Sequence, residues 1–267
     1  METVRSRDGT CIAFDRIGQG TPVVLVVGAF NVRATGQPLA EALASDHTVF
    51  TYDRRGRGDS TDTPPYAVAR EIDDLAAVIE AAGSSAAVFG YSSGAMLGLQ
   101  AAAAGLSISR LAMYEAPYLP RGAAPDISHT DALAELIDAG RRGEAVEYFQ
   151  TRVVGIAAAT VVQMRTAPFR PALEAMAHTL VYEAMVLGDR ALPTDLAGQF
   201  STPTLVMAGG ASSAFMSTSA QSLASILSNA QLLILDGQNH DLNPSVLAPA
   251  LRRFLQPSKD WGQPSMG

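Results

Sequence analysis

Cysteine, tryptophan and charged residues are scarce in this sequence. It has one cysteine and one tryptophan, and 17% of its 267 residues are charged. The single cysteine, Cys11, cannot form a disulfide within the chain, which excludes an internally disulfide-bonded fold. The four histidines are scattered, and no cluster has the spacing of a zinc site. We therefore expect no metal site.

Long apolar runs and basic stripes are also missing. No run reaches the roughly 18 apolar residues that span a bilayer, and residues 1–8 contain no apolar export signal. The net charge of −7 disfavours nucleic acid, and we interpret Arg54, Arg55 and Arg57 as a structural hydrogen-bonding corner. Hydrophobic residues make up 48%, enough for a core. We expect a soluble, cytoplasmic, globular protein that binds neither membrane nor nucleic acid; its oligomeric state stays open, a homodimer included.

Short β-rich apolar runs alternate with alanine-rich helical stretches, which is typical of a mostly parallel sheet with helices on both faces. Between Ala116 and Phe200 the alternation stops and prolines separate a series of helices, so we interpret this segment as an inserted lid. The eight expected strands are Val4–Arg7, Cys11–Arg16, Pro22–Val27, His47–Tyr52, Ala86–Phe89, Arg110–Tyr114, Thr204–Met207 and Gln231–Leu235. The expected helices are Ala69–Ala82 and Ser93–Ala103 in the core, and Asp131–Ala139, Gly143–Val154 and Ala172–Leu187 in the insertion. The predicted division is a core in two parts, 1–116 and 200–256, a helical lid insertion at 117–199 and a flexible tail at 257–267.

The run Gly90-Tyr91-Ser92-Ser93-Gly94 fits the pattern G-x-S-x-G between an expected strand and an expected helix. In this context a serine sits on a sharp turn that projects its hydroxyl above the sheet, and the glycines let neighbouring backbone approach. The helix that follows directs its first N–H groups toward developing negative charge. The pattern predicts Ser92 as a nucleophile.

A serine hydroxyl at neutral pH needs a base, and His240 is the best placed histidine. It follows the last expected strand and precedes the final helix, where a loop can reach Ser92. His47 precedes a strand, and His129 and His178 lie in the insertion, where packing roles are the simpler interpretation.

With the serine turn and His240, three further stretches resemble the α/β-hydrolase superfamily. Outside the insertion, this resemblance covers about two-thirds of the chain. Val26–Asn31 occupies the place of the family's oxyanion loop, Tyr52–Ser60 resembles the signature after the fourth strand, and Gly237–His240 resembles the histidine loop. The resemblance implies an α/β-hydrolase fold. One departure is Gly28, which stands where the family usually has histidine.

Backbone N–H groups form the oxyanion hole of this family, so Gly28 does not abolish the implied function. By the same resemblance the donors are the amides of Ser93 and Phe30, with Ala29 as the fallback for Phe30.

A second departure concerns the acid that orients the histidine. The family usually places an aspartate after the penultimate strand, but Met207–Phe215 contains no carboxylate. Glu115 ends the strand expected beside the nucleophile strand, and a minority of the superfamily uses that position. The stretch Ala112–Pro117, together with the acid-free loop Gly209–Phe215, is similar to the lactone hydrolases that open zearalenone. The alternatives left open are a Ser92–His240 dyad, or Asp241 or Asp236 as the acid; Asp53 and Asp59 are interpreted as structural.

Together these residues predict a serine hydrolase that cleaves a carboxylic ester or lactone through an acyl-enzyme, without a cofactor. The apolar insertion favours a small to medium-sized apolar substrate. The same residues could serve an acyltransferase, a thioesterase, a carbon–carbon bond hydrolase or a cyclase in natural-product metabolism, or remain in a receptor without turnover. The expected substrate-binding residues are Ala29, Tyr91, Met164 and Met185.

Overall fold

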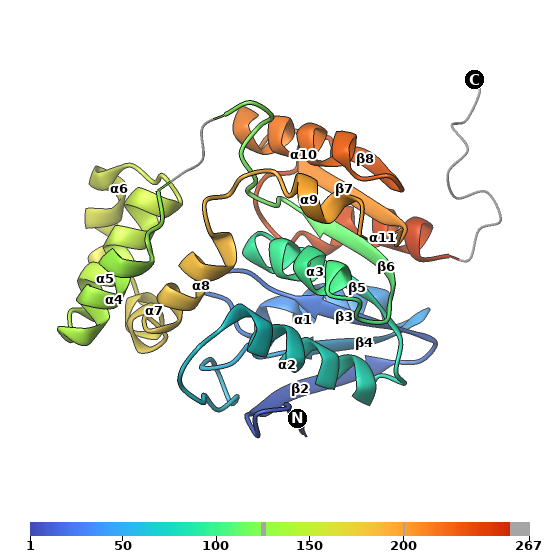
Figure 1. Ribbon diagram of the computed structural model, residues 1–267, viewed down its shortest axis with the longest axis horizontal. Coiled ribbons are helices and arrows are strands. Elements are labelled where there is room, and N and C mark those ends of the chain that lie inside the picture. Colours follow the sequence, from blue (N-terminus) through green and yellow to red (C-terminus); the bar gives the residue numbers. More distant parts are fainter. Residues whose placement is uncertain (124–126, 200, 257–267) are drawn as a thin grey trace.

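A single eight-stranded sheet organises the computed structural model, which describes residues 1–123, 127–199 and 201–256 (Figure 1). The strand order is β1-β2-β4-β3-β5-β6-β7-β8; the pairs β1/β2 and β2/β4 are antiparallel and the others are parallel. The strands are β1 Glu2–Arg5, β2 Cys11–Gly18, β3 Thr21–Val26, β4 His47–Tyr52, β5 Ala86–Tyr91, β6 Ile108–Tyr114, β7 Thr204–Gly209 and β8 Ala230–Leu235. The expected mostly parallel sheet is therefore confirmed. The tail predicted at 257–267 lies outside the described residues.

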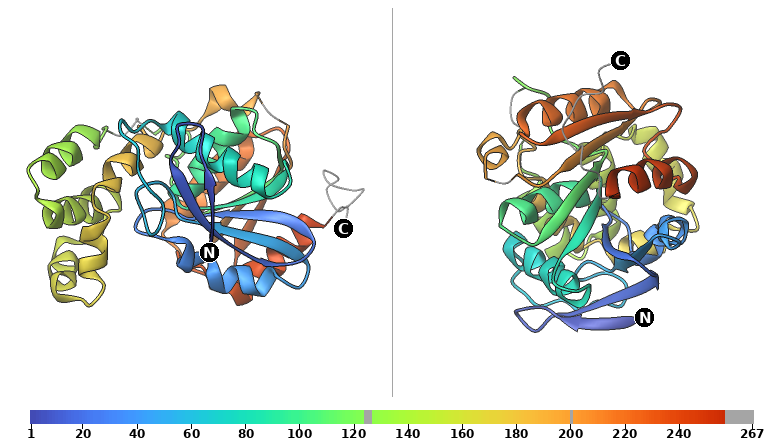
Figure 2. Two further views of the ribbon diagram at one scale, coloured as in Figure 1. Left: turned by 90° about the horizontal axis from the view of Figure 1, so that it is seen from below. Right: turned by 90° about the vertical axis from the view of Figure 1, so that its right-hand side faces the viewer.

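Successive side chains of a strand point to opposite faces of the sheet, and the core divides accordingly. In β3, Val24 and Val26 pack in one apolar cluster, and Val23 and Leu25 pack in another. The first cluster is covered by α2 Val68–Ala81, α3 Ser93–Ala103 and α10 Ala214–Ile226, and the second by α1 Arg33–Leu43 and α11 Pro244–Leu255 (Figure 2). Helices on both faces leave the carboxyl ends of the parallel strands as the edge where side chains can meet a ligand.

The first strand is displaced from its expected position. The expected strand at Val4–Arg7 is observed at Glu2–Arg5. Ser6 N donates to Thr10 O at 2.8 Å and Gly9 N donates to Ser6 O at 2.9 Å, so the turn begins at Ser6 and includes Arg7.

Between β6 and β7 the chain forms a helical insertion. Figures 1 and 2 show that α4–α7 project beyond the end of the sheet, while α8 lies between them and α3. Its helices are α4 Thr130–Asp138, α5 Arg142–Tyr148, a π-helix Phe149–Val153, α6 Ala158–Gln163, a short 3-10 helix Met164–Thr166, α7 Arg170–Ala175, α8 Thr179–Leu187 and α9 Thr194–Ala197. None of the described helices is long and apolar enough to cross a bilayer.

Two expected helices of the insertion are wrong as continuous elements. The helix expected at Ala172–Leu187 is interrupted, because Arg142 donates from Nε to Glu174 O and from Nη2 to Ala175 O, both at 2.7 Å, and so ends α7. The helix expected at Gly143–Val154 changes to π-helix at Phe149. A single π-helical turn inside a helical segment often accompanies a functional site.

Candidate active site

Ser92 occupies a sharp turn between β5 and α3. Its backbone has φ 56° and ψ −125°, a region that residues other than glycine rarely adopt. Its N–H donates to Tyr114 O at 2.9 Å. The backbones of β3 and α3 approach closely here, since a Cβ on Gly94 would lie 2.2 Å from Val26 O. The turn therefore needs glycine at position 94 and holds Ser92 in a strained, half-buried position.

Gly28 faces this turn directly. A Cβ on Gly28 would lie 2.9 Å from Ser92 Cβ and 3.0 Å from Tyr91 O. A side chain there would displace the serine turn or the oxyanion loop. The departure from the family's usual histidine thus has a local steric reason.

Two backbone N–H groups close to Ser92 are without acceptors. Within the described residues, the N–H groups of Ser93 and Phe30 donate to no other group of the chain. Ser93 is the first residue of α3, and Phe30 has φ 61°. The Phe30 ring meets Phe149 of the insertion edge to face, with centroids 5.4 Å apart. A strained loop with an unused amide is what an oxyanion hole requires.

Glu115 and His240 are brought together across two strand ends. The pairing of Tyr91 with Tyr114 in the β5/β6 register places Ser92 and Glu115 at corresponding positions after the two strands. Glu115 is 1% exposed and has φ 55°. Its Oε2 lies 2.9 Å from His240 Nδ1, and its Oε1 accepts from Gly209 N at 2.7 Å. The carboxylate is buried, held by backbone, and in contact with the imidazole.

Two tyrosines at the ends of β5 and β6 hold the histidine loop. Tyr91 Oη donates to His240 O at 2.6 Å, and Tyr114 Oη donates to Asn239 O. Burial raises the pKa of both phenols, so both remain protonated donors. The buried Gln238 adds bonds from Nε2 to Asp241 O at 2.7 Å and to Asn239 O at 3.2 Å. The His240 backbone is therefore fixed while 43% of its side chain stays exposed.

The other acids considered from the sequence have no contact with the imidazole. Asp236 and Asp241 are exposed, and Asp241 N donates to Asn239 Oδ1. The Ser92 hydroxyl has no hydrogen-bonding partner among the described residues, His240 included. Such bonds are often long in ligand-free enzymes and shorten when substrate binds.

A buried ion network lies behind the oxyanion loop. Arg54 contacts Glu71 of α2 and Glu183 of α8, each at 2.5 Å, and Arg57 also pairs with Glu183. Burial opposes the charge on Arg54, but Glu183 and Glu71 outweigh it and hold the pKa of this guanidinium well above its usual value. Arg55 pairs separately with Asp74 at 2.6 Å. These arginines have internal partners, as the interpretation of a structural corner requires.

The expected substrate-binding residues have different surroundings. Tyr91 is 8% exposed, and its ring packs against His240 with centroids 5.0 Å apart, so its contacts are with the histidine loop. Ala29 is half-buried in the oxyanion loop. Met164 follows α6 and is half-buried, and Met185 on α8 is 38% exposed. No described contact joins either methionine to Ser92, and a role in substrate binding stays a prediction for all four.

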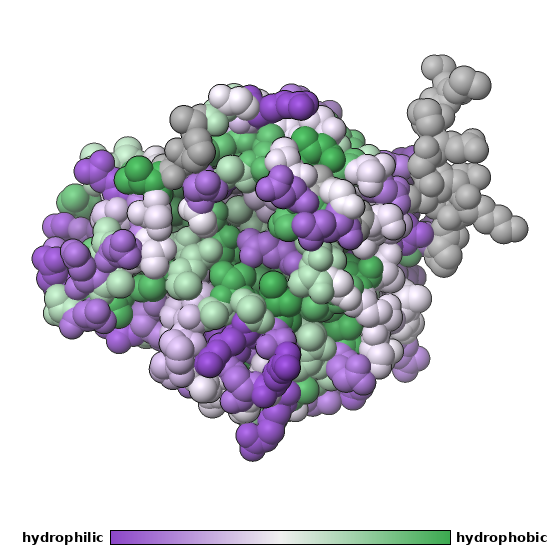
Figure 3. Space-filling model, viewed as in Figure 1, coloured by the Kyte–Doolittle hydropathy of each residue, from purple (hydrophilic) through white to green (hydrophobic). Residues whose placement is uncertain are grey.

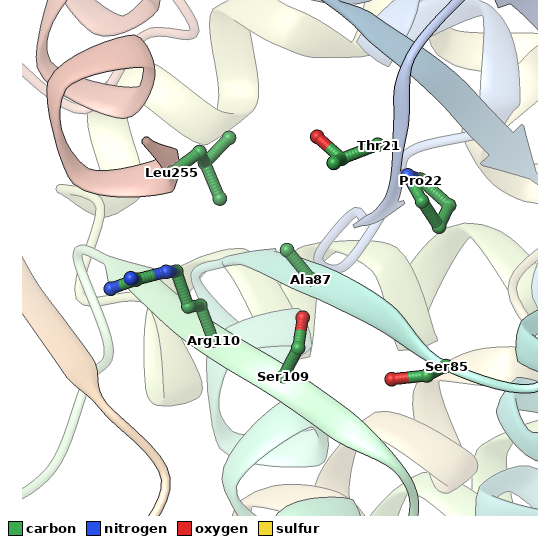
Figure 4. A pocket seen from close by; sticks show the side chains of 7 residues that line it. All are labelled: Thr21, Pro22, Ser85, Ala87, Ser109, Arg110 and Leu255. Atoms are coloured by element: carbon green, nitrogen blue, oxygen red, sulfur yellow. The ribbon is translucent and has the colours of Figure 1, made fainter. Parts of the chain in front are cut away.

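A cavity of about 280 Å³ lies at the opposite edge of the sheet (Figure 4). Its walls come from the amino ends of β3, β5 and β6 and from the end of α11, and none of its residues belongs to the candidate site. They are Thr21, Pro22, Ser85, Ala87, Ser109, Arg110 and Leu255. Ligands of open parallel sheets bind at the carboxyl ends of the strands, so we assign the chemistry to the Ser92 edge. Within the described ranges no three His, Cys, Asp or Glu residues are grouped to hold a metal ion.

Comparison with known proteins identifies the family and the fold of the chain. The model of the alpha/beta hydrolase family matches residues 23–251. The chain belongs to that family. A crystal structure of an alpha/beta hydrolase from Sphaerobacter thermophilus DSM 20745 is 53% identical with a TM-score of 0.89, over 96% of this chain and 100% of that one. The esterase RhEst1 from Rhodococcus sp. ECU1013 is 21% identical with a TM-score of 0.64, over 95% of this chain and 97% of that one, and shows the fold alone.

A curated relative from Azorhizobium caulinodans, named as a carbamate hydrolase, RutD, is 37% identical over 89 residues. This match covers 33% of this chain and 34% of that relative.

Sequence reasoning did not find Glu183, Gln238 or the role of Tyr114. Glu183 is the single charge in the apolar run Thr179–Leu187, and a lone carboxylate in such a run is a signal for a buried partner. Gln238 and Tyr114 act through backbone carbonyls, and a sequence carries no signal for that kind of contact.

Proposed function

We propose that this member of the alpha/beta hydrolase family cleaves carboxylic esters or lactones by acyl transfer through Ser92 to water. The observation that carries the proposal is the buried Glu115 carboxylate, which lies 2.9 Å from His240 Nδ1. It lies at the carboxyl ends of the parallel strands, where Ser92 follows β5. A carboxylate on Nδ1 leaves Nε2 free to take a proton. The usual acid of the family is absent from the loop after β7, and Glu115, directly after β6, replaces it.

The reaction begins with attack by Ser92 Oγ on the substrate carbonyl carbon while His240 Nε2 takes the hydroxyl proton. The carbonyl π electrons move to oxygen, and the amides of Ser93 and Phe30 stabilise that oxyanion. Collapse expels the alcohol, which receives the proton from His240. Water then repeats the sequence on the acyl-enzyme and frees the acid and Ser92. Glu115 orients the imidazole and stabilises its positive form.

The substrate in this proposal is a small to medium-sized apolar ester or lactone. The insertion supplies the apolar surface, since Phe149 packs on Phe30 beside the oxyanion loop. In Figure 3 hydrophilic and hydrophobic residues are mixed over α4–α7. Several large apolar side chains of the insertion are exposed: Ile127, Val154, Val162, Phe169 and Met185. We propose that the insertion acts as a lid over the Ser92 edge.

Replacement of the nucleophile tests the proposed function. Ser92→Ala should abolish hydrolysis of 4-nitrophenyl butyrate and labelling by a fluorophosphonate probe, because only the attacking oxygen is lost. The melting temperature should stay within a few degrees of wild type, since the turn is held by its glycines. Activity of Ser92→Ala at the wild-type level would refute the nucleophile. A folded wild-type protein that neither labels nor turns over would favour a receptor on this fold.

A further inference from the structure

Glu183 is fully buried although it belongs to the insertion, and it contacts two arginines of the core. Its Oε1 accepts from Arg54 Nη1 at 2.5 Å and from Arg57 Nη2. Arg54 also has Glu71, but Glu183 is the one carboxylate in contact with Arg57 among the described residues. The group of two guanidinium cations and two carboxylates is electrically balanced, and it loses that balance without Glu183.

The same two arginines hold the backbone of the oxyanion loop. Arg57 Nη1 donates to Gly28 O at 2.8 Å and to Asn31 O at 3.3 Å, on either side of Phe30. Arg54 Nη1 donates to Val27 O at 3.3 Å. These carbonyls flank the strained peptide whose N–H is the proposed second oxyanion donor.

Further contacts hold α8 against the segment that contains Arg54 and Arg57. Tyr182 Oη donates to Asp62 Oδ2 at 2.6 Å, and Thr179 approaches Gly56 so closely that a Cβ there would lie 3.1 Å from its methyl group. Because α8 is rigid over one turn, Glu183 is held in register with Arg54 and Arg57.

We propose that Glu183 is a positioning residue for the oxyanion hole. It fixes the Arg57 and Arg54 guanidiniums, which in turn fix the Val27–Asn31 backbone and the direction of the Phe30 N–H. This inference rests on the proposed function and extends it, because it makes α8 part of the catalytic architecture. A misdirected amide loses stabilisation of the oxyanion, which forms only in the transition state, so the effect belongs in kcat rather than KM.

The test compares Glu183→Gln with Asp74→Asn. Each substitution removes one carboxylate charge that is paired with a buried arginine of the segment Arg54–Arg57. Arg55 and Asp74, however, contact no carbonyl of the oxyanion loop. With 4-nitrophenyl butyrate, kcat of Glu183→Gln should fall by about tenfold or more at a KM within about threefold of wild type. Its affinity for an alkyl trifluoromethyl ketone, whose Ser92 adduct carries an oxyanion, should fall by the same factor. Asp74→Asn should keep kcat and the ketone affinity within about twofold of wild type, while its melting temperature falls about as much as that of Glu183→Gln.

Equal kcat and ketone affinity in the two variants would overturn the positioning role. If Glu183→Gln does not fold, the charge-balanced double variant Glu183→Gln, Arg57→Gln takes its place. The double variant should show the same loss of kcat, and wild-type kcat in it would overturn the inference. An inert wild-type protein would refute the proposed function and this inference with it, whereas equal variants of an active protein refute this inference alone.

Discussion

Glu115 combines three properties that seldom occur together in one residue. It is buried, its backbone is left-handed, and its two carboxylate oxygens have different partners, His240 and the Gly209 N–H. A backbone strain of this kind persists only where the surroundings enforce it. Five non-glycine residues in the described part of the chain have positive φ, and three of them, Phe30, Ser92 and Glu115, belong to the candidate site; the other two are Ser84 and Arg190.

Substitution of Glu115 by glutamine keeps the size of the side chain and an acceptor for Gly209 N. It removes the charge opposite the imidazolium and lets His240 adopt the wrong tautomer. We expect kcat for 4-nitrophenyl butyrate to fall by up to about ten-thousandfold, with folding retained in circular dichroism.

The matched controls for this variant are Asp236→Asn and Asp241→Asn. Both carboxylates are exposed and should change kcat by less than about threefold. A collapse of turnover in either control, with Glu115→Gln active, would assign the acid to that aspartate instead. Near-wild-type turnover in all three variants would favour a Ser92–His240 dyad.

The contact of Glu115 with His240 could be predicted from the absence of an acid after β7, because a histidine base still needs a partner and few carboxylates end a strand. The contact with Glu183 was beyond the same reasoning. It joins residues 129 positions apart, and the run Thr179–Leu187 suggests burial without naming the partner. Local patterns report which residues are buried, and long-range pairing is decided by the packing of the whole chain.

The opening hairpin shows how one turn connects an element to the core. Asp8 accepts from Thr10 N at 3.0 Å, from Thr10 Oγ1 at 2.6 Å and from Arg55 Nη1 at 3.0 Å. Burial alone would raise the pKa of Asp8, but these hydrogen bonds outweigh it and lower the pKa to about 2. The unfolded chain takes up this proton near pH 4, and the folded chain near pH 2.

The contribution of Asp8 to stability is therefore complete above about pH 4 and is lost as the pH falls toward about 2. Asp8→Asn should lower the free energy of unfolding by about 1–2 kcal/mol at pH 7, and the difference from wild type should shrink at pH 3. Urea denaturation at pH 7, 4 and 3 measures it. Asp138→Asn, at the exposed end of α4, is the control without such a trend. A difference independent of pH would contradict the role of the Asp8 charge.

At the level of elements, strands were easier to predict than helices of the insertion. Every expected strand overlaps an observed one, because a short β-rich run bounded by Gly, Pro or Asp is recognisable locally. The break between α7 and α8 was not, since it depends on Arg142 taking the last carbonyls of α7 from another helix. The three-residue turn between them contains neither glycine nor proline.

Across the whole molecule, the insertion and the sheet share one apolar cluster. Leu180, Ala184 and Leu187 of α8 pack in the same cluster as Val26 and Leu97. The sequence alone predicts that the sheet survives excision of Ala116–Phe200. The buried Glu183 changes that expectation, because its removal leaves two buried arginines with Glu71.

Two excisions separate these expectations. Joining Leu119 to Arg190, whose backbones are hydrogen-bonded at 2.7 Å, removes the insertion with α8. A second variant replaces residues 120–176 by a Gly/Ser linker and keeps α8. The first should lose about 3–5 kcal/mol more than the second, and can fail to fold, because it breaks a buried ion pair. Thermal and urea unfolding give the comparison, and equal stability of the two would show that α8 is dispensable to the core.

The place of Glu115 directly after β6 also bears on which substitutions this protein can tolerate. The loop after β7 contributes the Gly209 N–H and the Ala211 N–H, which donates to Gln238 O, and no side chain to the imidazole. If Glu115 is the acid, as we propose, catalysis depends on the backbone of that loop, and most of its side chains have no direct part in the chemistry. Under this proposal, substitutions of the side chains in this segment would change one border of the active site at little cost to the chemistry.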